Sequence, residues 1–189
     1  MPRKLRIVLG ITGASGVIYG IRLLETLVSF GHEVYVIVSS AALKVMELET
    51  EYTMDYIHQL ATKVYGQDDL TAPLTSGSFK FDVMVIAPCS MNTLAAIAHG
   101  LESNLILRTA SVALKEKRKL ILVPRETPLS IIHLENMLAV ARAGAVVLPA
   151  SPGFYHKPTK LMDLVDHIVG KILDQLGIEH NLYRRWEGG

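Results

Sequence analysis

The chain has 189 residues, of which 50% are hydrophobic and 20% are charged, and its formal net charge is +1. This composition excludes a disordered chain, and the balanced charge excludes the electrostatic footprint of proteins that bind nucleic acid or anionic membranes. Apolar runs fall far short of the roughly 20 residues that a membrane-spanning helix needs, so we expect no membrane partner.

Strand-like runs alternate with helix-length segments from one end of the chain to the other. The runs are nearly continuous in apolar residues, which is typical of strands covered on both faces. They are Leu5–Ile11, Glu33–Val38, Val83–Ala87, Lys119–Val123 and Ala145–Leu148, with a weaker sixth near Leu70–Leu74. Apolar residues at helical spacing predict a first helix from about Gly16 to Phe30 and a last one from about Thr159 to Leu176. The alternation predicts an α/β fold with a mainly parallel sheet and helices on both faces, in three layers.

The length indicates one domain over residues 1–189. The single cysteine, Cys89, excludes an internal disulfide, and the first residues lack the long apolar segment of a signal peptide. We therefore expect a cytoplasmic protein. A C-terminal tail over about 178–189 leaves the alternation, and we expect its last part, residues 181–189, to pack on a neighbour or to fray.

In a parallel α/β sheet the functional site lies where loops gather at the carboxyl ends of the strands. After the first strand, the loop Thr12–Gly16 consists of small residues and opens a helix, so its backbone N–H groups suit an anion. Its glycines match neither a Walker loop nor a good G-x-G-x-x-G pattern. The alternative is a tight turn in which Ser15 only caps the helix.

Hydroxyl groups follow the second strand, where a dinucleotide enzyme usually has an acidic residue. Ser39 and Ser40 can donate to a phosphate, which argues against NAD and for a mononucleotide or another phosphate ester. The alternative is that one serine only caps the next helix. Further along, the segment Pro88–Thr93 opens an apolar helix and offers a second amide-rich platform. No base stands beside Cys89, so we expect a buried, inert thiol.

The next loop combines Arg125 with Glu126. A guanidinium suits bidentate binding of phosphate, and the neighbouring carboxylate suits acid–base chemistry; the alternative is a surface ion pair between the two. After the last strand, residues 149–158 are rich in proline and aromatic side chains that can line a pocket. The seven histidines lack metal-ligand spacing and no serine-nucleophile elbow occurs, so we expect no metal site.

Six motifs in chain order together resemble the UbiX/Pad1 flavin prenyltransferases, and the likeness covers essentially the whole chain. They are GITGASGVIYG at 10–20, LET at 48–50, SGSF at 76–79, PCSMNTL at 88–94, PRETPL at 124–129 and FYHKP at 154–158. The resemblance implies a Rossmann-like, flavodoxin-like flavoprotein that assembles as a homododecamer. It implies an enzyme that joins the prenyl group of dimethylallyl phosphate to N5 and C6 of reduced FMN and releases phosphate without a metal. The prenylated FMN would then serve a UbiD-type decarboxylase.

The resemblance also implies which residues form the site. FMN would lie against Gly13, Ala14, Ser15, Ser39, Ser90, Met91, Asn92, Thr93 and Arg125. Dimethylallyl phosphate would meet Tyr155, Lys171 and Lys115, and the catalytic residues would be Glu126, Ser15 and Glu49. The two lysines rest on the resemblance alone, because lysines on polar helix faces or in charged runs are ordinarily solvated. Asn92 stands where several family members have lysine.

Two other functions stay open. One is a flavin-dependent decarboxylase of cysteinyl compounds, which shares the general fold, and the other is a module that binds or delivers FMN without chemistry. The high hydrophobic content with only 6% aromatic residues also predicts exposed aliphatic surface that a closed oligomer would cover.

Overall fold

A computed structural model describes residues 3–186 and residue 188. Its single sheet is parallel throughout and has the strand order β3-β2-β1-β4-β5-β6. The strands are β1 (Arg6–Ile11), β2 (Glu33–Val38), β3 (Lys63–Gly66), β4 (Val83–Cys89), β5 (Lys119–Pro124) and β6 (Val146–Val147). The strand order reverses between β1 and β4, and ligands of open α/β sheets bind outside the carboxyl ends at such a point.

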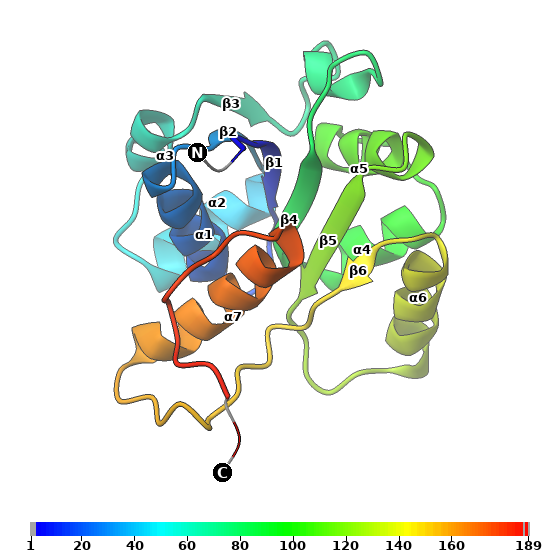
Figure 1. The fold of residues 1–189 in the computed structure, drawn as a ribbon. Helices are drawn as coiled ribbons and strands as arrows, with labels where there is room; N and C mark the ends of the chain where they lie inside the picture. The colour runs from blue at the N-terminus through cyan, green and yellow to red at the C-terminus, as the bar shows by residue number, and fades with distance from the viewer. Residues whose placement is uncertain (1–2, 187, 189) are drawn as a thin grey trace.

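Helices cover both faces of the sheet, which confirms the predicted three-layer α/β fold (Figure 1). One face carries α1 (Val17–Ser29), α2 (Ser40–Glu49), α3 (Met54–Leu60) and α7 (Leu161–Leu176). The other carries α4 (Met91–Ala98), α5 (Leu105–Lys115) and α6 (Ile131–Arg142), with the 3-10 turn η1 (Pro73–Thr75) packed against α5.

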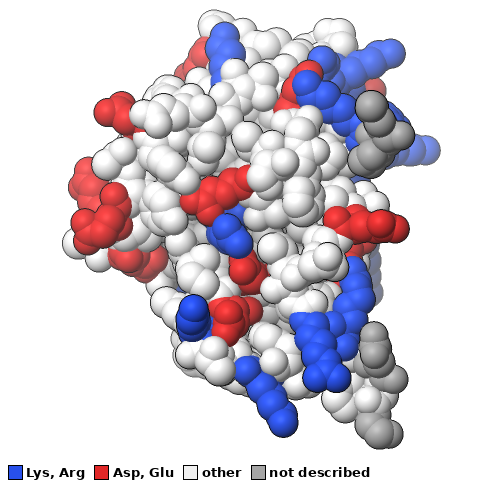
Figure 2. Space-filling model, turned by 60° about the vertical axis from the view of Figure 1, so that its left-hand side comes forward, with Lys and Arg blue, Asp and Glu red and all other residues white. Residues whose placement is uncertain are grey.

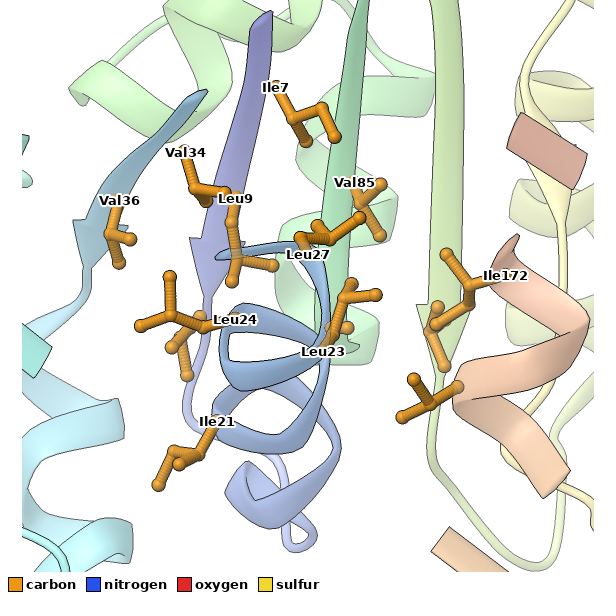
Figure 3. Close-up of a cluster of buried hydrophobic side chains, with 14 of the residues drawn as sticks. Ile7, Leu9, Ile21, Leu23, Leu24, Leu27, Val34, Val36, Val85 and Ile172 are labelled. Carbon is orange, nitrogen blue, oxygen red and sulfur yellow. The ribbon is translucent and has the colours of Figure 1, made fainter. Parts of the chain in front are cut away.

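The core is divided by the sheet into two apolar clusters. Side chains of a strand point alternately to its two faces, so Ile7 and Leu9 of β1 face α1 while Val8 faces the opposite cluster. Figure 3 shows Leu24 and Leu27 of α1 directed at these strand residues. Each fully buried side chain of this kind contributes about 1.5–3 kcal/mol of transfer free energy, so the packing holds the strand ends in fixed positions.

The weak sixth strand was predicted at the wrong place. Leu70–Leu74 forms turns that lead into η1, and Leu74 packs into the cluster on the α5 face. The strand is β3, a four-residue edge strand that pairs with β2 alone. Its sequence, KVYG, buries only Tyr65 and therefore lacks the continuous apolar run that marks the central strands.

His180, Tyr183 and Arg185 of the C-terminal tail dock on α7 of the same chain, so the expected fraying does not occur there, and packing of residues 181–189 on a neighbour stays a prediction. Gly170 has no side chain, so the rings of Tyr183 and His180 pack directly on the helix; a Cβ there would lie 2.5 Å from the Tyr183 ring. Asp174 accepts hydrogen bonds from Tyr183 Oη at 2.6 Å and from Arg185 Nη2 at 2.8 Å. Residues 187 and 189 of the predicted tail lie outside the described part.

The surface carries charges of both signs. On the face drawn in Figure 2, acidic and basic side chains are interspersed among uncharged ones. Of the helices that the structure describes, none combines the length and the apolar character needed to traverse a bilayer.

Candidate active site

Three helix N-termini meet at the carboxyl edge of the sheet. Helices α1, α2 and α4 begin directly after β1, β2 and β4, which are adjacent in the order β2-β1-β4 (Figure 1). A helix N-terminus carries N–H groups without intrahelical partners and a partial positive charge. The topology therefore builds an edge that favours an anionic ligand.

The loop after β1 approaches α2 very closely. A Cβ on Gly13 would lie 2.4 Å from the Cβ of Ala41, so this position has room for glycine only. Gly16 has φ 99° and is the N-cap of α1, which has no side-chain cap among the described residues. The alternative in which Ser15 caps α1 is therefore wrong, and Ser15 is exposed. Glu49 closes the loop, because its Oε2 accepts from the Gly16 N–H at 2.7 Å.

A buried threonine joins the two central loops. Thr12 Oγ1 donates to the carbonyl of Pro88 at 2.8 Å and accepts from the N–H of Ser90 at 2.8 Å. Thr12 is only 1% exposed. The loops after β1 and β4 are therefore held together across the point where the strand order reverses.

The hydroxyls predicted to meet a ligand also cap helices. Ser39 Oγ accepts from the Ala42 N–H at 3.1 Å, so this serine caps α2, and its contact with a ligand stays a prediction. Ser90 Oγ accepts from the Thr93 N–H at 3.2 Å and lies 3.0 Å from Thr93 Oγ1. A capping hydroxyl uses a lone pair and keeps its own proton, so the cap does not prevent donation to a ligand. The Cys89 thiol is fully buried, and burial raises its pKa, as expected of an inert cysteine.

Arg125 follows β5 at the same edge. Its Nε is buried and has no hydrogen-bond partner among the described residues. Burial raises the pKa of Tyr19, and the charge of Arg125 opposes that rise, so the guanidinium acts on the tyrosine at the start of α1. Among the described residues, Arg125 and Glu126 do not form an ion pair with each other. Glu126 is exposed instead, and its Oε1 accepts from the Thr127 N–H at 3.0 Å.

Tyr155 lies in the last loop and packs against α7, the helix that carries Lys171. The Tyr155 hydroxyl lies 3.3 Å from Nε2 of His167, and its ring meets Trp186 edge-on with centroids 5.9 Å apart. Lys171 lies one helical turn after His167, and its Nζ is 3.8 Å from Asp174 Oδ2. Its side chain is 49% exposed, which leaves the ammonium accessible to a ligand.

Lys115 is not brought to this edge within one chain. It ends α5, which leads into the start of β5, whereas Arg125 follows the end of β5. The motif at 76–79 lies near Lys115, because Arg118 donates to the carbonyls of Gly77 and Phe79. Lys115 and the motif at 76–79 therefore lie at the amino edge of the sheet.

Comparison with known proteins agrees with this architecture. The family model described as Flavoprotein matches residues 1–176. A flavin prenyltransferase UbiX of Thermoplasma acidophilum is 50% identical over 182 residues, which is 96% of this chain and 100% of the relative. The chain belongs to the UbiX family of flavin prenyltransferases.

Two solved structures of the UbiX family have nearly the same fold. The crystal structure of AnUbiX (PadA1) in complex with FMN and dimethylallyl pyrophosphate has a TM-score of 0.96 and 46% identity, covering 99% of this chain and 100% of that one. A dodecameric FMN-dependent UbiX-like decarboxylase from Escherichia coli O157:H7 has a TM-score of 0.94 and 45% identity, covering 96% and 99% of the two chains.

The residues of this UbiX-family chain fit a flavin mononucleotide. The buried Nε of Arg125 needs an acceptor, the close approach at Gly13 brings backbone to the edge, and α1 begins without a side-chain cap. Among the residues that the structure describes, no group of three potential metal ligands occurs.

Two polar residues that contact candidate site residues or join the site loops were not predicted from the sequence. From the sequence, Thr12 is identified only as the first residue of a small-residue loop. A polar side chain at the end of an apolar strand is the signal that could have indicated its role in joining two loops. His167 is buried on α7, twelve residues after Tyr155, and no spacing rule connects the two.

Proposed function

We propose that this UbiX-family protein transfers the dimethylallyl group of dimethylallyl phosphate to reduced FMN, at N5 and C6, and releases phosphate. The observation that carries the proposal is the buried Nε of Arg125, which has no hydrogen-bond partner within residues 3–186 and lies at the edge where three helix N-termini meet. A buried donor without a partner costs about 1–3 kcal/mol, which an anionic ligand would recover. The reaction class is proposed from relatives of this chain that are named flavin prenyltransferase.

The FMN would be held by the loops after β1, β2, β4 and β5. The proposed contacts are Gly13, Ala14, Ser15, Ser39, Ser90, Met91, Asn92, Thr93 and Arg125. Backbone N–H groups and hydroxyls in this set are donors, as the phosphate of FMN requires. When bound, reduced FMN supplies the electron-rich N5 and C6 that accept the prenyl group.

Tyr155 and Lys171 are proposed to hold the phosphate of the prenyl donor. The allylic C–O bond breaks with positive charge on the prenyl carbons and negative charge on the departing phosphate. A hydroxyl and an ammonium placed beforehand stabilise that negative charge without a metal ion. The aromatic rings of Tyr155 and Trp186, which meet edge-on, would face the allylic cation, because the faces of aromatic rings favour positive charge.

Glu126 is the proposed proton-transfer group. One carboxylate oxygen accepts from the Thr127 N–H, so the other is left to take the proton released from C6 or to protonate phosphate. Glu49 and Ser15 are proposed as further catalytic residues. Because Glu49 already accepts from Gly16, its contribution includes holding the loop that carries Ser15.

We propose a homododecamer in which Lys115 serves the site of a neighbouring copy. Lys115 lies at the opposite edge from Arg125, so a contact with the prenyl donor requires a second chain. Four large aliphatic side chains on α6 are at least half exposed and suit a subunit contact: Ile131 (74%), Ile132 (67%), Leu134 (51%) and Leu138 (50%). Light scattering at micromolar concentration tests this, since a 20.8 kDa monomer would contradict it.

The decisive experiment is an anaerobic incubation with reduced FMN and dimethylallyl phosphate, followed by mass spectrometry of the flavin. A mass gain of one isoprene unit is expected, with unchanged rate in EDTA. Decarboxylation of a C-terminal cysteinyl peptide without any gain would favour the decarboxylase, and FMN binding with neither reaction would favour the delivery module. Running dimethylallyl diphosphate in parallel decides which donor this chain prefers.

The remaining proposals concern the setting of the reaction. We propose that residues 1–189 form one flavin-binding domain, supported by one sheet that runs through the described residues. We also propose a cytoplasmic location, supported by the lone buried cysteine, and a UbiD-type decarboxylase as recipient of the product. Activation of a flavin-free decarboxylase of that type by the reaction mixture tests the last proposal.

A further inference from the structure

A buried histidine lies directly beneath the tyrosine assigned to the prenyl donor. His167 is 6% exposed on α7, whereas Tyr155 in the loop above it is 42% exposed. Their Nε2 and Oη atoms are 3.3 Å apart. The imidazole is fixed from two sides, by His156 in a parallel stack with centroids 5.1 Å apart and by Tyr183 at 4.8 Å.

The backbone selects the tautomer of this histidine. The N–H of Gly153 donates to Nδ1 of His167 at 3.3 Å, so Nδ1 carries a lone pair. A neutral imidazole with an unprotonated Nδ1 has its proton on Nε2. The neutral form is favoured, because burial lowers the pKa of His167 and the neighbouring His156 and Lys171 lower it further, against a smaller opposing effect of Asp174.

We propose that His167 is a positioning residue for the prenyl donor, donating its Nε2–H to Tyr155 Oη so that the hydroxyl's own proton points outward to the phosphate. A tyrosine hydroxyl whose oxygen already accepts a hydrogen bond does not turn its proton back to that donor. This inference rests on the assignment of Tyr155 to the donor phosphate made above. The inference also explains why this buried position holds a polar side chain, although a phenylalanine would fill the same space.

The test compares the KM for dimethylallyl phosphate and kcat, in the anaerobic assay, for the native protein and four variants. They are His167→Phe, His167→Gln, Tyr155→Phe and the double variant His167→Phe/Tyr155→Phe. His167→Phe is expected to raise the KM about 3- to 10-fold, the effect of one hydrogen bond, with kcat and FMN affinity changed less than twofold. His167→Gln keeps an N–H near the Nε2 position and is expected to recover most of the loss.

Non-additivity separates positioning from packing. In the Tyr155→Phe background, His167→Phe is expected to change the KM less than twofold, since the hydroxyl through which it acts is gone. His58→Phe, at an exposed histidine on α3, is the matched control and is expected to leave every parameter unchanged. An equal effect of His167→Phe in both backgrounds, or none in the native background, would overturn the inference, as would a native KM for Tyr155→Phe.

The tautomer gives a readout that needs no activity. Nitrogen-15 spectra of histidine-labelled protein, with the His167 signals identified by their loss in His167→Phe, are expected to show a proton on Nε2. A proton on Nδ1 would overturn the inference while leaving the proposed function intact. A native protein that shows the expected tautomer but forms no prenylated flavin would instead overturn the proposed function.

Discussion

Replacing Gly13 by alanine tests the close approach between the loop after β1 and α2. The added Cβ would lie 2.4 Å from the Cβ of Ala41 and 3.1 Å from its carbonyl carbon, so the loop and the helix have to move apart. Overpacking of this kind costs about 1–3 kcal/mol, which corresponds to a fall of about 2–12 °C in the melting temperature of a chain of this size. We also expect about tenfold weaker FMN binding, the equivalent of one lost hydrogen bond, because the displaced loop is proposed to hold the flavin.

Two further variants serve as controls for that prediction. Gly10→Ala adds a Cβ whose nearest neighbour, Ile86 Cγ1, is 3.4 Å away, so a much smaller effect is expected. Ala41→Gly removes the methyl group that Gly13→Ala strikes, so the double variant should lose less than the sum of the single losses. Urea unfolding of the flavin-free protein and FMN titration by fluorescence measure both quantities. If Gly13→Ala were as stable as Gly10→Ala, or strictly additive with Ala41→Gly, the steric reasoning would be refuted.

Three other expectations concern catalysis and pH. Glu126→Gln keeps the shape of the side chain but removes the proton-transfer group, so prenylated-flavin formation should slow about 10²- to 10⁴-fold with FMN affinity unchanged; a native rate would remove Glu126 from the mechanism. Lys171→Ala should raise the KM for dimethylallyl phosphate about 10- to 150-fold, with little loss of stability because its pair with Asp174 is half exposed. Burial lowers the pKa of His167 and His32 below 6.5, so the unfolded chain binds more protons and stability should fall as pH drops below that value. Denaturant midpoints between pH 7.5 and 5 check this, and His167→Phe should flatten the slope.

The central strands and the order of the loops were predictable because burial on both faces leaves a continuous apolar run. β1 and β4 are of this kind, and each is followed by the loop that the site uses. β3 was not predictable, since an edge strand buries one side only and its sequence has no such run. The apolar run at Leu70–Leu74 was misleading because Leu74 is buried by a turn rather than by a strand.

The parts of the candidate site that depend on contacts between distant elements could not be predicted from the sequence. The position of Lys115 follows from topology rather than from its local sequence, since a helix that precedes a parallel strand ends at the amino edge. The contact between Tyr155 and His167 depends on how the last loop folds back over α7. Arg125 was found from its type and place, but the burial of its Nε requires the packed structure.

The link made by Thr12 has a consequence for hydrogen exchange and for the entropy of binding. The N–H of Ser90 lies in a loop, yet it donates to a side chain that is itself 1% exposed, so its exchange with solvent should be as slow as that of a central strand. The two loops are then ordered when the protein folds rather than when the flavin arrives. Association has less conformational entropy to remove, and more of the contact free energy is left for affinity.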